Sequence, residues 1–211
     1  TTDKWLAGDG GPEHAILKNF VAYHRLAADY DKREAAGIEP ARAYIDEIRN
    51  LASFEEYASK IADFELAGKP TYFPFGVAPD FMDARINVLW ADGPGTILPD
   101  TTYYAEDHPQ KADLLAKWRK TQEDLLAKFD FAEEEINDLL DKVLELDAVF
   151  AQYVLSSEES SEYAKLYHPY KWDDFKALVP ELPLADIFTK LIGQEPDQVI
   201  VPEERFWQAA K

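Results

Sequence analysis

Apolar residues recur at helical spacing along most of the chain. The first such run predicts a helix that opens at Pro12, just after a Gly-Gly pair, and stops at Gly37. Proline is tolerated in a first helical turn because its missing N–H has no partner there in any helix. The apolar stripe of this helix is Ile16, Leu17, Phe20, Tyr23, His24 and Ala27.

The same spacing predicts further helices. A second one follows Pro40, and a capping box at Ser53-Phe54-Glu55-Glu56 opens a third that runs to about residue 67. Two long helices are predicted over residues 109–128 and 132–155, and the polar stretch 156–161 is predicted to be a loop. Shorter helices are predicted over residues 162–167, 172–178, 183–192 and 202–210.

Two segments instead favour β-structure. Residues 71–77 and 85–91 are rich in aromatic and β-branched side chains, and Ala78-Pro79-Asp80 between them is typical of a turn. Residues 199–201 form a short extended piece. The pattern therefore predicts a mainly α fold, a multihelical lobe with one two-stranded β-ribbon, and it shows no internal repeat, linker or domain boundary.

The charge balance excludes some partners. Aspartate and glutamate number 41 against 22 lysines and arginines, so the net charge is −19. Phosphate backbones and anionic membrane surfaces attract basic proteins, so we expect neither nucleic acid nor a membrane as a partner. No stretch approaches the eighteen apolar residues of a membrane span. Because 46% of the residues are hydrophobic, a packed core is expected despite the charge.

The chain contains no cysteine. Disulfides, thiolate metal sites and cysteine nucleophiles are thereby excluded. A cytoplasmic location in a bacterium is the expectation, with secretion as the alternative. The chain starts with Thr1 and lacks the features of a signal peptide, so we expect it to begin inside a longer reading frame or to have been processed.

The sequence contains no recognised catalytic motif. None of the four histidines, at positions 14, 24, 108 and 168, is followed by glutamate, so there is no H-E-x-x-H zinc helix. The acidic runs at 133–135 and 158–159 are interpreted as helix N-terminal charges rather than a catalytic acid pair. There is no G-x-S-x-G elbow and no P-loop. We predict no catalytic residue and no metal ligand in this chain.

Three stretches carry a resemblance to a known family. Residues 72–104 read YFPFGVAPDFMDARINVLWADGPGTILPDTTYY, which is a strand, an acidic turn, a second strand and a loop ending in L-P-x-x-x-Y-Y. Residues 156–170 read SSEESSEYAKLYHPY, and residues 201–207 read VPEERFW. In this order they resemble the neprilysin family of zinc metallopeptidases, and the last two resemble its bacterial oligopeptidase O branch. The resemblance covers nearly the whole chain and is weakest before about residue 35.

The resemblance implies a two-lobed zinc endopeptidase that cleaves short peptides. One lobe of such enzymes carries H-E-x-x-H, a further zinc-ligating Glu and an Asn-Ala pair. The other lobe is helical and closes a cavity over the active site, which limits substrates to short peptides. Residues 1–211 match part of the helical, N-terminal lobe only, so zinc and the catalytic lobe are expected elsewhere in the same polypeptide. Animal members are disulfide-bonded ectoenzymes, so the lack of cysteine favours a bacterial relative.

The residues of the family signature are Leu98, Pro99, Asp100, Tyr103 and Tyr104. We expect them to support the architecture rather than touch substrate, because Pro99 sets the backbone and the apolar side chains are suited to packing. The alternative hypothesis for the whole chain is a free-standing acidic helical domain that binds a partner protein and has no enzymatic activity.

A lobe cut within its own sequence is also expected to expose apolar surface. We predict this surface near the chain ends, around Phe206 and Trp207.

Overall fold

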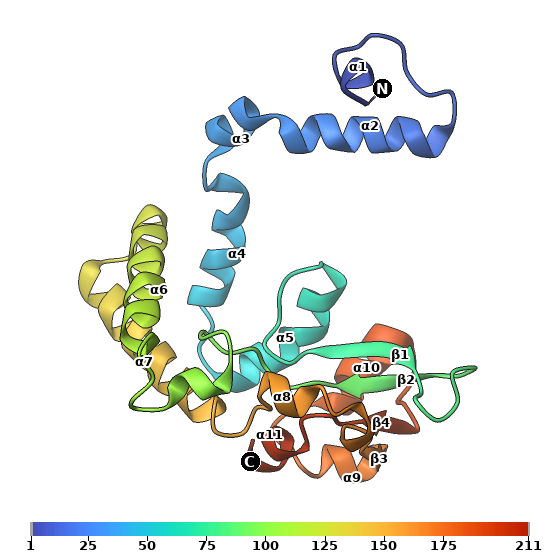
Figure 1. Cartoon of the computed structure of the whole chain (residues 1–211), viewed down its shortest axis with the longest axis vertical. Helices are drawn as coiled ribbons and strands as arrows, with labels where there is room; N and C mark the ends of the chain where they lie inside the picture. Colours follow the sequence, from blue (N-terminus) through green and yellow to red (C-terminus); the bar gives the residue numbers. More distant parts are fainter. Residues whose placement is uncertain (1, 211) are drawn as a thin grey trace. The chain divides into compact units, whose positions relative to one another are not determined.

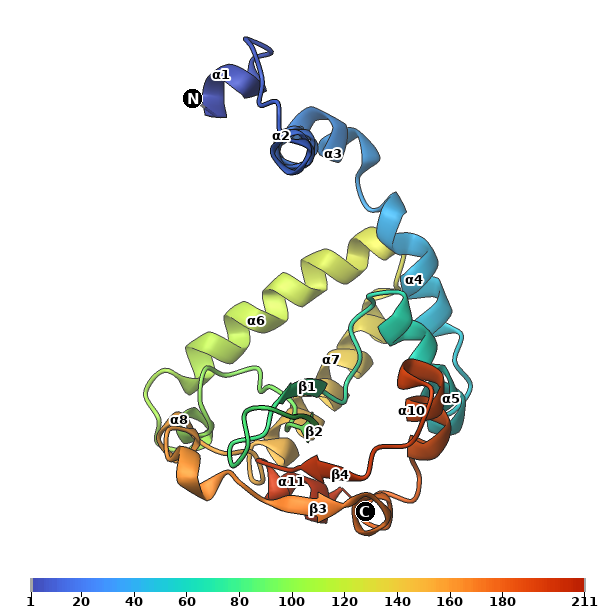
Figure 2. The same ribbon diagram turned by 90° about the vertical axis from the view of Figure 1, so that its right-hand side faces the viewer.

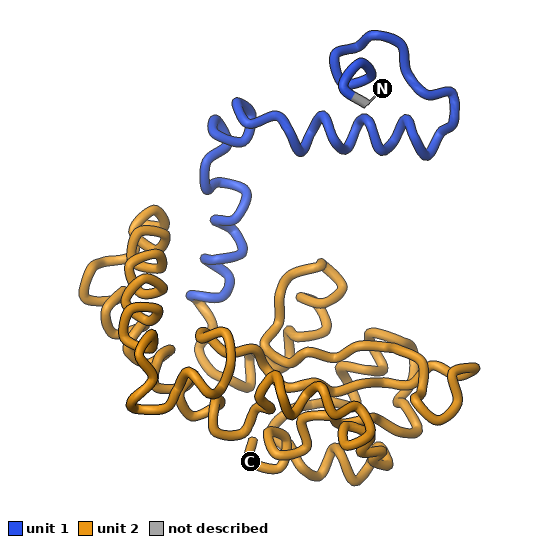
Figure 3. The backbone as a smooth tube through the Cα atoms, viewed as in Figure 1, with its two compact units in different colours: residues 1–49 blue, residues 50–211 orange. Residues whose placement is uncertain are grey.

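The computed structural model describes residues 2–210, which fall into two compact units. Figure 3 colours them separately: residues 1–49 form unit 1 and residues 50–211 form unit 2. The sequence indicated no boundary here, because helix and loop residues of ordinary composition run through it without a Gly- or Pro-rich linker. The two units are described separately below.

Unit 1 contains the helices α1 (Thr2–Leu6), α2 (Ala15–Ala28), α3 (Tyr30–Ala36) and α4 (Glu39–Arg49). The single helix predicted between Pro12 and Gly37 is in fact two helices. Asp29 separates them, because its side chain accepts a hydrogen bond from the backbone N–H of Lys32 at 3.0 Å and so caps α3. The predicted stop is confirmed, since Gly37 follows α3 with a φ of 53°.

Helix α2 has little cover within its own unit. Arg25 ties it to the end of α1 by donating a hydrogen bond to the Leu6 carbonyl at 3.3 Å. Val21 is buried, whereas Ile16 is 70% exposed and Tyr23 is 71% exposed. Exposed apolar surface therefore exists on this helix, away from the place where the sequence predicted it.

Unit 2 holds the remaining helices, and the mainly α class is confirmed (Figure 1). Its α-helices are α5 (Phe54–Leu66), α6 (Lys111–Leu126), α7 (Glu133–Phe150), α8 (Ser157–Ser160), α9 (Trp172–Lys176), α10 (Leu184–Ile192) and α11 (Glu204–Ala209). Its 3-10 helices are η1 (Thr101–Tyr104), η2 (Ala127–Phe129) and η3 (Tyr163–Lys165). The two long helices are confirmed inside their predicted limits, and the predicted helix 162–167 is a single 3-10 turn.

Two helix starts differ from the prediction in detail. The stretch 156–161, predicted to be a loop, contains α8, because Ser156 and Glu159 form a complete capping box. At α5 only half of the predicted box forms. Ser53 Oγ accepts from the Glu56 N–H at 3.2 Å, but the Glu56 carboxylate accepts from the Ala52 N–H at 2.9 Å instead of returning to Ser53.

Helices α6 and α7 lie side by side, as Figure 2 shows. Arg119 of α6 joins them, because its Nη1 donates to Asp141 at 2.6 Å and its Nη2 donates to the Asn137 side-chain oxygen at 3.1 Å. Arginine suits this position because its planar fork can reach two acceptors on the neighbouring helix at once.

The predicted ribbon is confirmed and is half of a larger sheet. Strands β1 (Phe75–Pro79) and β2 (Asn87–Ala91) pair antiparallel, β4 (Gln198–Ile200) pairs parallel to β2, and β3 (Pro169–Lys171) pairs antiparallel to β4. In the described part of the chain this gives a four-stranded sheet of order β1-β2-β4-β3. Strands β3 and β4 are three residues each, too short for a period-2 pattern to identify them as paired strands.

Both faces of the sheet are covered where β2 lies. Leu89 and Ala91 enter the main core with residues of α5, α9, α10 and α11, whereas Val88 and Trp90 enter a second, smaller cluster on the other face. Successive side chains of a strand point to opposite faces, so one strand contributes to both. This explains why four of the five residues of β2 are buried.

The main core contains the two C-terminal rings that we predicted to be exposed. That prediction was wrong, because Phe206 is 3% exposed and Trp207 is fully buried. The Trp207 indole N–H donates to the carbonyl of Ala91 at 3.1 Å and to that of Asp92 at 3.2 Å. Helix α11 therefore packs within unit 2, and the described residues cover both rings almost completely.

Candidate functional site

The signature residues lie where the chain leaves β2 and turns into η1. Leu98 is 2% exposed and anchors the turn in the protein interior, while Pro99 lies at the surface. The Tyr103 ring packs against His108 in a tilted arrangement, with 4.2 Å between ring centroids. The structure thus brings these residues into one compact turn, which is held by the contacts of Asp100 and Tyr104.

Asp100 uses both carboxylate oxygens to hold two helix starts. Oδ1 accepts from the Thr102 N–H at 2.8 Å and from the Thr102 hydroxyl at 2.6 Å, so it caps η1. Oδ2 accepts from the Ser157 N–H at 2.6 Å, at the start of α8. These bonds to Thr102 and Ser157 favour the charged carboxylate and hold the pKa of Asp100 well below its usual range.

Tyr104, which is half-buried, pairs with the buried Asp147 at the same turn. The Tyr104 hydroxyl donates to the Asp147 carboxylate and accepts from the Leu98 N–H at 3.1 Å. Asp147 is 7% exposed and also accepts from the Ile97 N–H at 2.9 Å. Burial, together with the hydrogen bond to the carboxylate, raises the pKa of Tyr104 to about 12. The pair therefore keeps a neutral phenol against an acceptor that also binds the backbone.

The three stretches that carry the family resemblance meet in space. Asp100 joins the first to the second through Ser157. Glu159 joins the second to the third, because its carboxylate accepts from the Arg205 guanidinium at 3.0 Å. Glu203 accepts from the Leu155 N–H at 2.9 Å, just before the second stretch. Motifs that are far apart in the sequence thus form one connected hydrogen-bonded network.

The described residues offer no metal centre. In residues 2–210 no group of three or more His, Asp or Glu side chains could hold a metal ion. His14 accepts from the Ile16 N–H at 3.3 Å, His24 contacts the Phe20 ring, and His168 Nδ1 lies 3.2 Å from the Val201 carbonyl oxygen. The donor sets of the described chain therefore do not fit a zinc ion.

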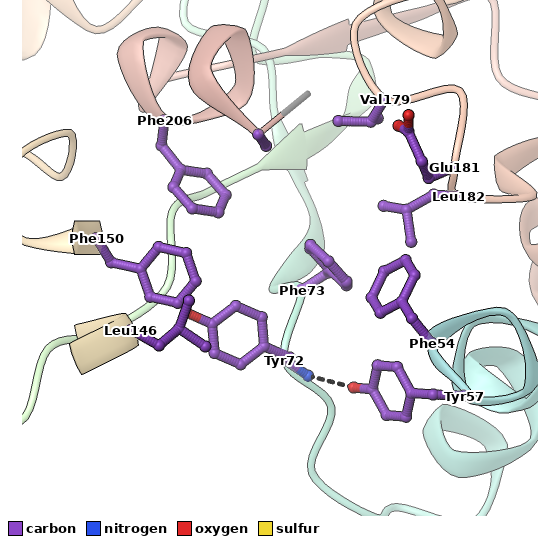
Figure 4. A pocket seen from close by; sticks show the side chains of 11 residues that line it. Phe54, Tyr57, Tyr72, Phe73, Leu146, Phe150, Val179, Glu181, Leu182 and Phe206 are labelled. Carbon is purple, nitrogen blue, oxygen red and sulfur yellow. Dashed lines mark hydrogen bonds between the residues drawn. The ribbon is translucent and has the colours of Figure 1, made fainter. Parts of the chain in front are cut away.

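Unit 2 also contains an aromatic pocket, shown in Figure 4, which the sequence analysis did not find. Its volume is about 520 Å³. Its lining residues are Phe54, Tyr57, Tyr72, Phe73, Leu146, Phe150, Val179, Glu181, Leu182, Phe206 and Ala210. They come from α5, from the segment before β1, from α7, from the α9–α10 connection and from α11, so no local pattern could have indicated the pocket.

One hydrogen bond organises the aromatic rings of this pocket. The Tyr57 hydroxyl accepts from the Tyr72 N–H at 2.9 Å, as the dashed line in Figure 4 shows. Tyr72 also lies against Phe150, with 5.2 Å between ring centroids. Burial is the main cause that raises the pKa of Tyr72 above its usual range, and the Asp147 charge adds to it. Glu181 is the one charged side chain in the lining.

Comparison with known proteins decides the family. The model for the N-terminal domain of peptidase family M13 matches residues 6–211. The chain belongs to peptidase family M13. The resemblance to the neprilysin family of zinc metallopeptidases is thereby confirmed.

Relatives of this M13 chain include a Streptococcus gordonii protein named as a zinc metalloproteinase in the scaA 5′ region, which is 95% identical over 211 residues. A neutral endopeptidase of Lactococcus lactis is 35% identical over 194 residues, which is 92% of this chain. The chain spans 37% of the first relative and 31% of the second, about a third of their lengths.

Solved structures of the same fold are known. PEPO from Lactobacillus rhamnosis superposes with a TM-score of 0.83 at 22% identity, over 94% of this chain and 34% of that protein. The zinc metalloprotease Zmp1 of Mycobacterium tuberculosis, in an open state, gives a TM-score of 0.72 at 19% identity, over 86% of this chain and 28% of that protein. In the described residues of our M13 chain, no helix is long and apolar enough to cross a membrane.

Proposed function

We propose that residues 1–211 are part of a zinc-dependent endopeptidase that cleaves short peptides, and that they wall its substrate cavity. The observation that carries the proposal is the match of residues 6–211 to the model for the N-terminal domain of peptidase family M13. The names of the relatives, zinc metalloproteinase and neutral endopeptidase, support the same activity for the intact protein.

In this proposal the chain contributes shape rather than chemistry. Zinc would supply a polarised water for peptide hydrolysis, and its ligands would come from the catalytic lobe of the same polypeptide. The helices of this chain would exclude bulky folded substrates and keep bulk water from the reaction. The signature residues would stabilise the fold rather than bind substrate. The polar groups of Asp100 and Tyr104 form hydrogen bonds with the protein's own backbone and with Asp147.

The alternative is a free-standing acidic helical domain that binds a partner protein. The net charge of −19 and the exposed apolar side chains of α2 are the features that suit it. The reading frame beyond residue 211 discriminates between the two proposals, because only the peptidase requires H-E-x-x-H downstream. A cytoplasmic location is still a prediction that rests on the lack of cysteine alone.

The size-filter role is tested on the intact protein with one scissile sequence in two contexts. We expect a short fluorogenic peptide to be cleaved in a chelator-sensitive reaction, and the same sequence to resist cleavage when it is placed in a loop of a stably folded domain. A control protease with an open active site should cleave both substrates. Equal rates on both substrates by the intact protein would contradict a cavity that selects by size.

The 211-residue chain by itself tests whether zinc binding and hydrolysis depend on the catalytic lobe. We expect no stoichiometric zinc and no hydrolysis of the short peptide, because the described residues provide no zinc ligand set. The intact protein, purified in parallel, is the positive control for both measurements. Zinc bound one to one, with turnover that a chelator abolishes, would place the active site within this chain instead.

A further inference from the structure

The aromatic pocket lacks a cover in the described chain. Phe54 and Leu146 at its rim are each 50% exposed, although the pocket holds about 520 Å³ of space between apolar walls. Hydrophobic surface of this size, hollowed and rimmed by aromatic side chains, is typical of a place where another segment packs. We therefore expect another segment to pack over this pocket.

The C-terminal end of the described chain lies beside the aromatic pocket. Helix α11 ends at Ala209, its residue Phe206 forms one wall of the pocket, and Ala210 also lines the pocket. The polypeptide therefore reaches the pocket at the end of the described residues. The relatives are much longer, since the chain covers only 37% of the Streptococcus gordonii protein, and the family model that it matches is the one for the N-terminal domain.

We propose that the segment immediately after residue 211 in the intact polypeptide folds back over the aromatic pocket and inserts apolar side chains between Phe54, Tyr72, Leu146 and Phe206. Roughly ten residues suffice to cross the pocket, because an extended chain spans up to about 3.3–3.6 Å per residue. Such a segment is an interaction partner that the polypeptide itself supplies.

Tethering favours this occupant over a free one. A segment that starts beside the pocket closes only a short loop when it packs there, so it loses little chain entropy. A separate peptide or a second copy would have to bind from solution and lose translational freedom as well. The single carboxylate in the lining, Glu181, gives the segment one place for a basic or N–H donor group beside its apolar anchors.

The proposal is tested with a matched pair of cysteine variants in the intact protein. Leu146 and Val149 lie on the same helix, α7, and are 50% and 48% exposed, but only Leu146 lines the pocket. We expect maleimide to label Leu146→Cys at least about tenfold more slowly than Val149→Cys, because a covered thiol reacts only when its cover opens. In denaturant both variants should react at the same rate, and the unsubstituted protein supplies the background.

The outcomes separate the possible occupants. Equal labelling of the two variants in the native protein overturns the proposal. Protection of Leu146→Cys that disappears on dilution also overturns the proposal, because it would indicate a second copy. Protection that arises only when a peptide substrate is added overturns it as well.

A photo-crosslinker on Leu146→Cys identifies the cover directly. We expect its adduct, located by mass spectrometry, within the segment that immediately follows residue 211. An adduct elsewhere in the polypeptide or on another molecule overturns the proposal. Neither measurement depends on peptidase activity. Failure of the proposal about the pocket is therefore distinguishable from failure of the proposed function.

Discussion

Asp100 accepts a hydrogen bond from the backbone N–H of Ser157, 57 residues further along the chain, with 2.6 Å between Oδ2 and the nitrogen. The same carboxylate caps η1 through Thr102. One side chain therefore fixes the loop after β2 to the start of α8. This gives a physical reason for an aspartate at this position of the signature that does not involve substrate.

Substitution of Asp100 by asparagine should weaken the acid dependence of stability. The hydrogen bonds from Thr102 and Ser157 lower the folded-state pKa of Asp100 below its ordinary value of 3.8. Its stabilising contribution is therefore present above about pH 4 and is lost as the pH falls below that value. We expect Asp100→Asn to melt at a lower temperature at pH 7, with a difference from the parent that shrinks toward pH 3.

Thermal unfolding between pH 3 and pH 8 measures this effect. Glu145→Gln is the matched control, because it removes an exposed carboxylate from α7. If the difference between Asp100→Asn and the parent is constant with pH, the lowered pKa of Asp100 does not contribute to stability.

Removal of the buried carboxylate of Asp147 should destabilise the protein by about 1–3 kcal/mol, because the partly buried Ile97 N–H and Tyr104 hydroxyl would lose their acceptor. Tyr104→Phe should cost a similar amount, since it also leaves the Leu98 N–H without its partner. Urea unfolding of Asp147→Ala, Tyr104→Phe and the double variant measures both. The double variant should lose less than the sum, and strict additivity would show that the two side chains act independently.

Gly93 should not tolerate a side chain, whereas Gly95 should. A Cβ built on Gly93 would lie 2.7 Å from Cγ of Glu203, while one on Gly95 meets nothing within 4 Å. We expect Gly93→Ala to lose about 1–3 kcal/mol through overpacking, and Gly95→Ala to be neutral or slightly stabilising. Shortening the opposing side chain with Glu203→Ala should recover part of the loss in the double variant. Equal melting temperatures for the two single variants would contradict the close approach.

Glu203 should give a pH dependence opposite to that of Asp100. Burial raises the pKa of Glu203, although the Leu155 N–H and the Arg205 charge oppose the shift. A carboxyl with a raised folded-state pKa costs stability once the pH exceeds that pKa, and this cost is relieved as the pH falls. We expect Glu203→Gln, whose amide oxygen can still accept from Leu155, to gain stability relative to the parent at pH 8 and to lose this gain near pH 4. Melting temperatures at the two pH values decide the question.

Trp207 should be among the most sensitive positions of the chain. Its ring is fully buried and its indole N–H binds two backbone carbonyls, so Trp207→Ala should cost about 3–5 kcal/mol by leaving a cavity and unpaired acceptors. Tyr163→Ala is the control, since Tyr163 is 69% exposed and its loss should cost less than about 0.5 kcal/mol. Similar urea midpoints for the two variants would show that α11 does not pack as described.

The sequence predicted what depends on neighbours within a few turns. Apolar periodicity located the long helices α6 and α7, and Gly37 marked a helix end because glycine adopts positive φ at low cost. The lack of cysteine and of H-E-x-x-H follows from residue identity alone, and so did the resemblance that the family model confirmed. Whether the signature residues serve architecture alone is still a prediction.

Only the tertiary structure decided features that join distant residues. The pairing of β4 with β2 adds two three-residue strands to the predicted ribbon, and strands so short are stable only because their neighbours supply hydrogen bonds. Trp207 is buried in the same core as Ala91 of β2, over a hundred residues earlier, and its indole N–H donates to the Ala91 carbonyl. The aromatic pocket gathers side chains from five separate segments, four of which supply aromatic rings. Burial of this kind depends on packing between elements, which hydrophobic spacing along one element does not determine.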